Sequence, residues 1–213
     1  MSTSTAVEVL SAVFQVREPV DGRATLHVLL TRPADAGPWS LPGGGVGERE
    51  TLAAAARRHL GGQCGLTRVA HLEQLSVLSE PDRIPGERTI ASSYLALVPR
   101  DVPAEPAGET PAAWFDIDEL PDLAYDHGAI IELGRSRLSA KLSYTNLAFA
   151  LAPARFAMSE LSEIYGAALG YPVDSTNLLR VLSRRGVVVA TGTVGRTGRS
   201  GGRPPSLYTF ADD

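Results

Sequence analysis

A glycine-rich turn leading into an alanine-rich helix, with strand patterns on both sides, narrows the possible folds of this chain more than any other feature. Residues 41–45 (LPGGG) favour a tight turn, and residues 51–60 (TLAAAARRHL) predict a helix that stops at Gly61 and Gly62. Runs rich in apolar and β-branched residues predict strands, over residues 7–16, 26–30, 72–78 and 90–98. Strands and helices alternating at this spacing predict a mixed α/β domain.

A helical pattern runs from residue 127 to residue 150 and stops before Pro153, which marks a domain boundary. After this boundary, Ser159 is expected to cap a short amphipathic helix that ends at Gly170. We therefore expect a second, smaller unit in the C-terminal part of the chain.

The smaller unit continues with a second helix, which Asp174 is expected to cap and which covers residues 175–185. Its inner face is predicted to carry Leu178, Val181 and Leu182. Two strands, at 187–191 and 206–210, enclose a loop rich in glycine and arginine. Helix, turn, helix, strand, basic loop and strand, in this order, are typical of a winged helix.

The net charge of −4 is unevenly spread along the chain. Residues 1–153 carry 13 Lys+Arg against 19 Asp+Glu, whereas residues 154–213 carry 7 against 5. Between Ser175 and Ala211 there is no acidic residue, but there are six arginines. A basic patch on an acidic body indicates contact with a polyanion, although a solvated basic surface has the same composition.

The second helix of the smaller unit has a polar face suited to reading DNA. At helical spacing its members share one side: Thr176, Asn177, Arg180 and Arg184. In the major groove, Arg pairs with guanine and Asn with adenine through two hydrogen bonds each. An ordinary amphipathic helix with a solvated arginine face is the alternative reading.

The loop after this helix favours the DNA reading. Three arginines stand among glycines in a segment that ends at Pro204 and Pro205, namely Arg196, Arg199 and Arg203. Such a segment makes a poor core element but a good wing, which binds phosphates or enters a narrow minor groove. Helix and wing together predict DNA binding.

The stretch from Leu41 to Leu66 resembles the Nudix box, and the surrounding strand pattern extends the resemblance to about residues 7–150. The matching positions are Gly44, Glu50, Arg58, Gly65 and Leu66. The resemblance implies that Glu50 and Arg58 brace the loop against the helix. It also implies that the catalytic glutamates of the family fall at His59, Gly62 and Gln63 in this chain.

These three residues cannot replace carboxylates as ligands for magnesium, because hard cations need anionic oxygen ligands. We therefore expect neither a metal site, nor a cofactor, nor catalysis from this box. Two other readings stay open. Glu48 and Glu50 could support a residual hydrolase, and a 26-residue match with three mismatches can arise by chance.

A Nudix-like pocket without catalysis can still bind a nucleotide-like ligand. Arg83 and Arg88, which precede a predicted strand, are candidates for bidentate contacts with phosphates. Trp39 is a candidate for stacking on a base. The alternative readings are surface ion pairs for the arginines and a core contact for the tryptophan.

Nearly the whole chain resembles the NrtR family, the Nudix-related regulators of NAD metabolism. Three segments carry this resemblance: WFDIDELPDLAYDHGAII, FAMSELSEIYGAALGYPVD and GGRPPSLYTF. It implies a Nudix-like effector domain joined to a winged helix, acting as a dimeric repressor at palindromic operators. ADP-ribose or a related NAD metabolite is the implied effector. Asn177 matches the family pattern, but Leu178 and Leu179 follow it where basic residues are usual.

The sequence thus predicts an α+β protein: a Nudix-like α/β/α sandwich over residues 1–150 and a winged-helix domain over residues 151–213. We expect a homodimeric, catalytically inactive repressor of NAD synthesis or salvage genes. No apolar run is long enough for a membrane span, and the single cysteine, Cys64, fits a reducing cytoplasm.

The rival reading is a hydrolase of ADP-ribose, or of a related nucleoside diphosphate, with an appended nucleic-acid-binding domain. A nucleotide-binding or RNA-binding adaptor fits less well. Stacking on single strands needs exposed aromatic residues, and Tyr208 and Phe210 of the basic segment both fall in a predicted strand.

Overall fold

The structure is a computed structural model, and it describes residues 5–18, 22–32, 37–102, 106, 110–195 and 204–211. Arg196, Arg199 and Arg203, the predicted wing arginines, lie outside the described residues. Within the described residues, no helix has the length and apolarity needed to cross a membrane.

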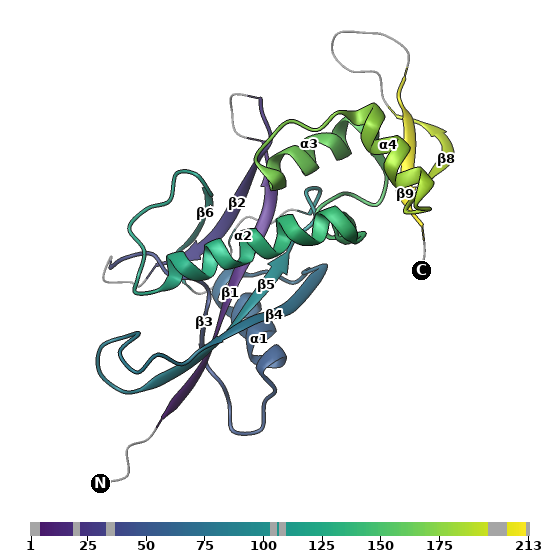
Figure 1. The fold of residues 1–213 in the computed structure, drawn as a ribbon. Helices are drawn as coiled ribbons and strands as arrows, with labels where there is room; N and C mark the ends of the chain where they lie inside the picture. The colour runs from purple at the N-terminus through teal and green to yellow at the C-terminus, as the bar shows by residue number, and fades with distance from the viewer. Residues whose placement is uncertain are drawn as a thin grey trace.

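A mixed six-stranded sheet forms the body of the molecule (Figure 1). Its strands lie in the order β4-β5-β1-β2-β6, and β3 also pairs with β1. Only β1 and β5 run parallel among these pairs. Four predicted strands are confirmed to within one or two residues: β1 (Ala6–Arg17), β2 (Thr25–Thr31), β4 (His71–Leu78) and β5 (Thr89–Leu97). The sheet also contains β3 (Gly43–Gly45) and β6 (Ala112–Asp116).

One helix covers each face of this sheet, as Figure 1 shows. Alternate side chains of β1 point to opposite faces, so Val9 and Val13 pack with α1 (Leu52–Cys64) while Phe14 packs with α2 (His127–Tyr144). The α2 side chains in this cluster are Ile130, Ile131, Leu138 and Leu142. The predicted α/β/α sandwich is confirmed.

Two helix boundaries differ from the prediction. Helix α1 continues through Gly61 and Gly62 and ends at Gly65, which adopts a left-handed φ of 68°. Burying Leu60 and Cys64 against the sheet outweighs the helix penalty of about 1 kcal/mol for each glycine. The pattern over 127–150 is not one helix, because α2 ends at Tyr144 and a 3₁₀ helix, η1, follows over Leu147–Ala150.

The break after α2 has a local cause at Thr145. Its hydroxyl donates to the carbonyl of Lys141 at 2.8 Å and accepts from the backbone N–H of Leu147 at 3.2 Å. A threonine that bonds its neighbours in this way competes with the helical backbone pattern. The chain therefore turns at this point before it enters the second unit.

The second unit has the order expected of a winged helix. A three-stranded sheet in the order β7-β9-β8 packs with two helices. The bounds are β7 (Phe156–Ala157), α3 (Met158–Leu169), α4 (Ser175–Arg184), β8 (Val188–Val194) and β9 (Ser206–Phe210).

Asp174 caps α4 as predicted, because its Oδ1 accepts from the N–H of Asn177 at 2.7 Å. Two other local predictions are wrong. Ser159 does not cap α3, since the pairing of β7 with β9 places the helix start at Met158. Val181 is 40% exposed, because only the narrow stripe of Leu178 and Leu182 is buried.

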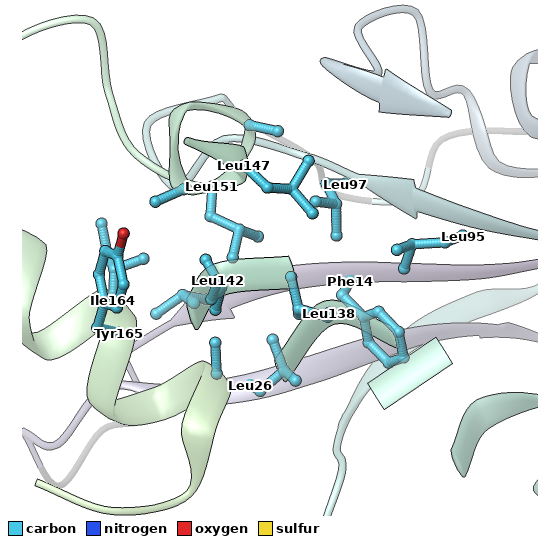
Figure 2. Packing of buried hydrophobic residues seen from close by; sticks show 14 of the residues in the cluster. Phe14, Leu26, Leu95, Leu97, Leu138, Leu142, Leu147, Leu151, Ile164 and Tyr165 are labelled. Atoms are coloured by element: carbon cyan, nitrogen blue, oxygen red, sulfur yellow. The ribbon is translucent and has the colours of Figure 1, made fainter. Parts of the chain in front are cut away.

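The two units share one continuous hydrophobic core (Figure 2). Leu26 of β2 and Leu142 of α2 belong to the same buried cluster as Ile164 and Tyr165 of α3. Leu151, which follows η1, lies in this cluster too. The winged helix therefore packs on the end of the Nudix-like sheet instead of hanging from a linker.

Candidate functional site

The glycine-rich segment of the Nudix-like box is a short strand, where the sequence predicted only a turn. Gly43 lies so close to β1 that an added Cβ would stand 2.0 Å from the carbonyl oxygen of Val9. Gly44 has a φ of 147°, and a Cβ there would meet the imidazole of His59 at 2.9 Å. Both positions therefore require glycine, which lets the loop lie directly against β1 and α1.

Glu50 and Arg58 brace this loop, as the resemblance to the Nudix box implied. The guanidinium of Arg58 donates from Nε and Nη2 to the two carboxylate oxygens of Glu50, at 2.8 and 2.7 Å. Nη2 also donates to the carbonyl of Gly45 at 3.1 Å. The hydrogen bonds from Arg58 and then from the N–H of Gly47 lower the pKa of Glu50 to about 2. Glu50 is therefore a charged structural group and not a proton donor near neutral pH.

Two of the three residues at the catalytic positions bind the loop themselves. The side-chain amide of Gln63 accepts from the N–H of Gly43 at 3.0 Å and donates to its carbonyl at 2.7 Å. Nε2 of His59 donates to the carbonyl of Gly45 at 3.0 Å. Gly62, at the third position, is exposed and has no side chain to contribute. Hydrogen bonds thus join α1 to the loop.

The donor set at these positions does not fit the divalent cations of the Nudix family. With Nε2 of His59 donating to Gly45, the lone pair on Nδ1 faces Nε2 of Gln63, 3.4 Å away. The amide oxygen of Gln63 is neutral and already accepts a hydrogen bond. Within the described part of the chain, no group of three or more His, Cys, Asp or Glu is placed to hold a metal ion.

A buried histidine holds the other end of the same loop. Nδ1 of His127, the first residue of α2, accepts from the N–H of Leu41 at 2.9 Å. Burial lowers the pKa of His127 to about 4, and the attraction of Asp126 for the charged form only partly offsets this. His127 is therefore neutral at pH 7, as an acceptor at Nδ1 must be.

The lowered pKa of His127 predicts that the folded protein loses stability in acid. The unfolded chain takes up a proton on His127 near pH 6.5, whereas the folded chain does so only near pH 4. The contribution of neutral His127 to the free energy of unfolding is fully present above pH 6.5 and is lost as the pH falls to 4. The difference between the two pKa values corresponds to a loss of roughly 3 kcal/mol. Urea unfolding measured from pH 7 to pH 4 checks this loss.

The control for this prediction is His127→Asn, which keeps an acceptor near Leu41 but does not titrate. Its free energy of unfolding should change less with pH over this interval than that of the wild type. Equal pH dependence in both proteins would show that other groups cause the acid sensitivity.

Arg83 is buried and lies between two carboxylates. Its side chain is only 2% exposed. Nε and Nη2 donate to the carboxylate of Asp126 at 2.9 and 2.8 Å, and Nη1 donates to Glu8 at 2.6 Å. The structure therefore places this predicted phosphate ligand in a closed ion-pair cluster beside the start of α2.

The other two predicted ligand residues lie at more open positions. Arg88 is exposed and donates to the carbonyl of Ser79 at 3.3 Å. Trp39 is half-buried, with its ring edge-on to Phe115 and the guanidinium of Arg32 5.6 Å from its centroid. Trp39 and Arg32 line an open cleft of about 400 Å³. In the described part of the chain, no hydrogen bond or cation–π contact joins Arg88 to Trp39.

Backbone hydrogen bonds join Trp39 to the segment that carries Asp126 and His127. The N–H of Trp39 donates to the carbonyl of Asp122 at 2.9 Å, and the N–H of Ala124 donates to the carbonyl of Trp39 at 2.8 Å. The segment before α2 thus touches the cleft, the Arg83 cluster and the loop. Sequence reasoning missed this role, and the adjacent Asp126 and His127 at a helix start were its only signal.

The predicted DNA-reading face of α4 is exposed along its whole length: Thr176, Asn177, Arg180 and Arg184. Nη2 of Arg180 donates to Oδ1 of Asn177 at 2.7 Å, so these two side chains lie together. Their face points away from the core stripe of Leu178 and Leu182.

Comparison with known proteins agrees with this architecture. Residues 11–133 match the model of the NUDIX domain, and residues 148–210 match that of the NrtR DNA-binding winged helix domain. The ADPR responsive transcriptional repressor NtrR of Acinetobacter baylyi is 30% identical over 178 residues, which are 81% of this chain and 70% of that protein. The chain belongs to the NrtR family.

Solved structures share the fold of this NrtR-family chain. Shewanella oneidensis NrtR in complex with a 27mer DNA has a TM-score of 0.78 at 24% identity, covering 96% of this chain and 93% of that chain. The NUDIX domain of the same protein in complex with ADP ribose has a TM-score of 0.54 at 23% identity, covering 64% of this chain and 90% of that chain. At these identities the likeness establishes the fold.

Proposed function

We propose that this chain is an ADP-ribose-responsive transcriptional repressor. It binds operator DNA through α4 and the wing, and its Nudix domain senses the ligand. The observation that carries this proposal is the exposed polar face of α4, on a winged helix packed against a Nudix domain. The NtrR repressor of A. baylyi, a relative across most of the chain, supports the ligand and the role.

The Nudix domain acts as a sensor without catalysis. Support comes from His59 and Gln63, whose polar groups are occupied by the loop, and from Gly62, which offers no ligand. Glu50 is committed to Arg58 and is a poor substitute for the missing carboxylates. In this chain the side chains of His59 and Gln63 hold the loop. In active enzymes of the family, the residues at these positions bind metal ions instead.

This sensor role predicts two results with purified protein. Metal-dependent release of AMP from ADP-ribose stays at background in magnesium and in manganese. The affinity for ADP-ribose, measured by calorimetry, changes less than about twofold when magnesium is replaced by EDTA, because the described residues offer no anionic ligand set for the cation. Turnover that depends on added metal would instead support the hydrolase reading.

Several finer features belong to the same proposal. The protein acts in the cytoplasm as a homodimer, with a domain boundary between residues 150 and 151, and reads two half-sites of a palindrome. Its targets are genes of NAD synthesis or salvage. Arg88 and Trp39 contact the ligand in their open positions, and Arg83 does so only if the ligand displaces Glu8 or Asp126.

Gel shift on a palindrome from the protein's own promoter region tests the proposal. We expect retardation by the full-length protein, and a change in its extent when ADP-ribose is added. Absence of retardation even at low salt, where phosphate contacts are strongest, would contradict DNA binding.

A further inference from the structure

Helix α2 connects the two functional regions of the chain. At its first residue, Nδ1 of His127 accepts from Leu41, which leads into the glycine loop. Asp126, just before the helix, binds Arg83. The 18 residues of α2 pack along the sheet, and its start is held to the effector domain by these contacts.

The other end of α2 is bound by α4, the helix that carries the predicted DNA-reading face. Nη2 of Arg185 donates to the backbone carbonyl of Tyr144 at 2.8 Å. Tyr144 is the last residue of α2, and Arg185 is the residue that ends α4. The last carbonyls of a helix have no partner within the helix, and their partial negative charge favours a cation. One contact therefore joins the ends of the two helices.

The position of Arg185 on α4 separates it from the DNA-reading face. At roughly 100° per residue, Arg185 lies about 140° around the helix from Arg180. This direction is close to the buried stripe of Leu178 and Leu182 instead. Arg184, one residue earlier, lies on the reading face. Within the described structure, no hydrogen bond or ion pair joins it to α2. The two neighbouring arginines thus differ in what they contact.

A buried polar group near this junction lacks a partner among the described residues. The hydroxyl of Tyr165, on α3, is buried without a hydrogen-bond partner in the described structure. A buried polar group without a partner destabilises the arrangement in which it occurs. Open pockets of about 180 and 200 Å³ lie where α3 meets residues 23–26.

The start of α2 also carries strain. Tyr125, two residues before the helix, adopts a φ of 46°, in the left-handed region that is costly for residues other than glycine. A strained residue thus lies just before α2, and an unpartnered hydroxyl lies on α3, which packs against α2. A two-position element that both sites bias is what coupling requires.

We propose that α2 couples the glycine-rich loop of the Nudix-like box to α4, and that Arg185 is the positioning residue that transmits the movement of α2 to α4. The inference rests on the proposed function, since it names how the same effector site acts on DNA binding. A shift of α2 caused by ligand at the loop moves the carbonyl of Tyr144. Through Arg185 it changes the direction in which α4 presents Asn177 and Arg180.

The test compares Arg185→Gln with Arg184→Gln in the full-length protein. Each variant removes one arginine charge from the same helix end. The affinity for operator DNA is measured with and without saturating ADP-ribose, and the ratio of the two affinities measures the coupling. Hydrogen exchange of residues 141–147 is measured without either ligand.

Arg185→Gln should reduce the coupling ratio by about fivefold or more, a change within the usual range for allosteric coupling. It should also speed exchange at the end of α2. Arg184→Gln should weaken DNA binding while it leaves the ratio within about twofold of wild type and exchange unchanged.

The outcomes separate this inference from the proposed function. If the wild type binds DNA equally with and without ADP-ribose, the proposed function fails. If the wild type responds but Arg185→Gln keeps the full ratio, only the coupling role of Arg185 fails. Unchanged exchange at residues 141–147 in Arg185→Gln would overturn the inference in either case, because Arg185 would then not hold the end of α2.

Discussion

Replacing Arg83 by methionine is expected to lower the free energy of unfolding by roughly 3 kcal/mol, the low end of the range for breaking a buried ion pair. The Arg83 side chain is 2% exposed, and its guanidinium pairs with two carboxylates, those of Glu8 and Asp126. Without it, two like charges remain close together at partly buried positions. Both carboxylates keep some contact with water, about a fifth of each side chain being exposed, which limits the cost.

Urea unfolding at pH 7 measures this effect, and Arg88→Met is its matched control. Arg88 lies on the same loop, but its side chain is exposed and donates to a backbone carbonyl, so its loss should cost less than about 0.5 kcal/mol. Adding Glu8→Gln and Asp126→Asn to Arg83→Met should recover part of the lost stability, because the uncompensated charges are removed. Equal costs for the two arginine variants would contradict the buried cluster.

The second large effect is expected at the reading face of α4. Asn177→Ala and Arg180→Ala should each reduce the preference for operator over scrambled DNA by about 10- to 100-fold, as loss of one bidentate base contact does. Because Arg180 donates to Asn177 at 2.7 Å, the two side chains orient one another. The double variant should therefore lose less than the sum of the two single effects.

Fluorescence anisotropy at several salt concentrations distinguishes base reading from phosphate contact. Asn177→Ala should leave the salt dependence unchanged, whereas Arg199→Ala in the predicted wing should weaken binding to all sequences and reduce the salt slope by about 1. Arg155→Ala, an exposed arginine outside α4, controls for the loss of one charge. Sequence preference that survives in both α4 variants would place base reading elsewhere.

Local sequence signals were enough to predict the elements and part of the site. Strand patterns and the Asp174 cap depend on residues close together in the chain, and they are confirmed. The pairing of Glu50 with Arg58, which the resemblance to the Nudix box implied, is confirmed too. The glycines at 61 and 62 misled the prediction of a helix end. Their intrinsic preference is weak compared with the burial of Leu60 and Cys64 on the same helix.

Contacts between distant residues could not be predicted from the sequence. Arg83 meets Glu8 and Asp126 across 75 and 43 residues, and His127 meets Leu41 across 86. No local pattern encodes these pairs, because each depends on how the sheet and α2 assemble. The core shared by the two units was missed for the same reason, since an amphipathic helix does not reveal which surface it will cover.

At the catalytic positions, too, the residue types could be predicted from the sequence but their contacts could not. The sequence alone predicted that His59, Gly62 and Gln63 would not supply carboxylates. It did not predict that the amide of Gln63 would pair with the backbone of Gly43, or that His59 would hold Gly45. The change of residue type removes one chemistry, but only the folded loop shows which interactions take its place.

The central claim is that the Nudix domain controls DNA binding by binding a ligand, without chemistry on it. The most direct test is the operator affinity of the full-length protein in EDTA, titrated with ADP-ribose and with an analogue whose diphosphate bridge is a non-hydrolysable methylene. We predict that both ligands change the operator affinity, by the same factor. A change that requires magnesium and occurs only with the hydrolysable ligand would contradict the claim.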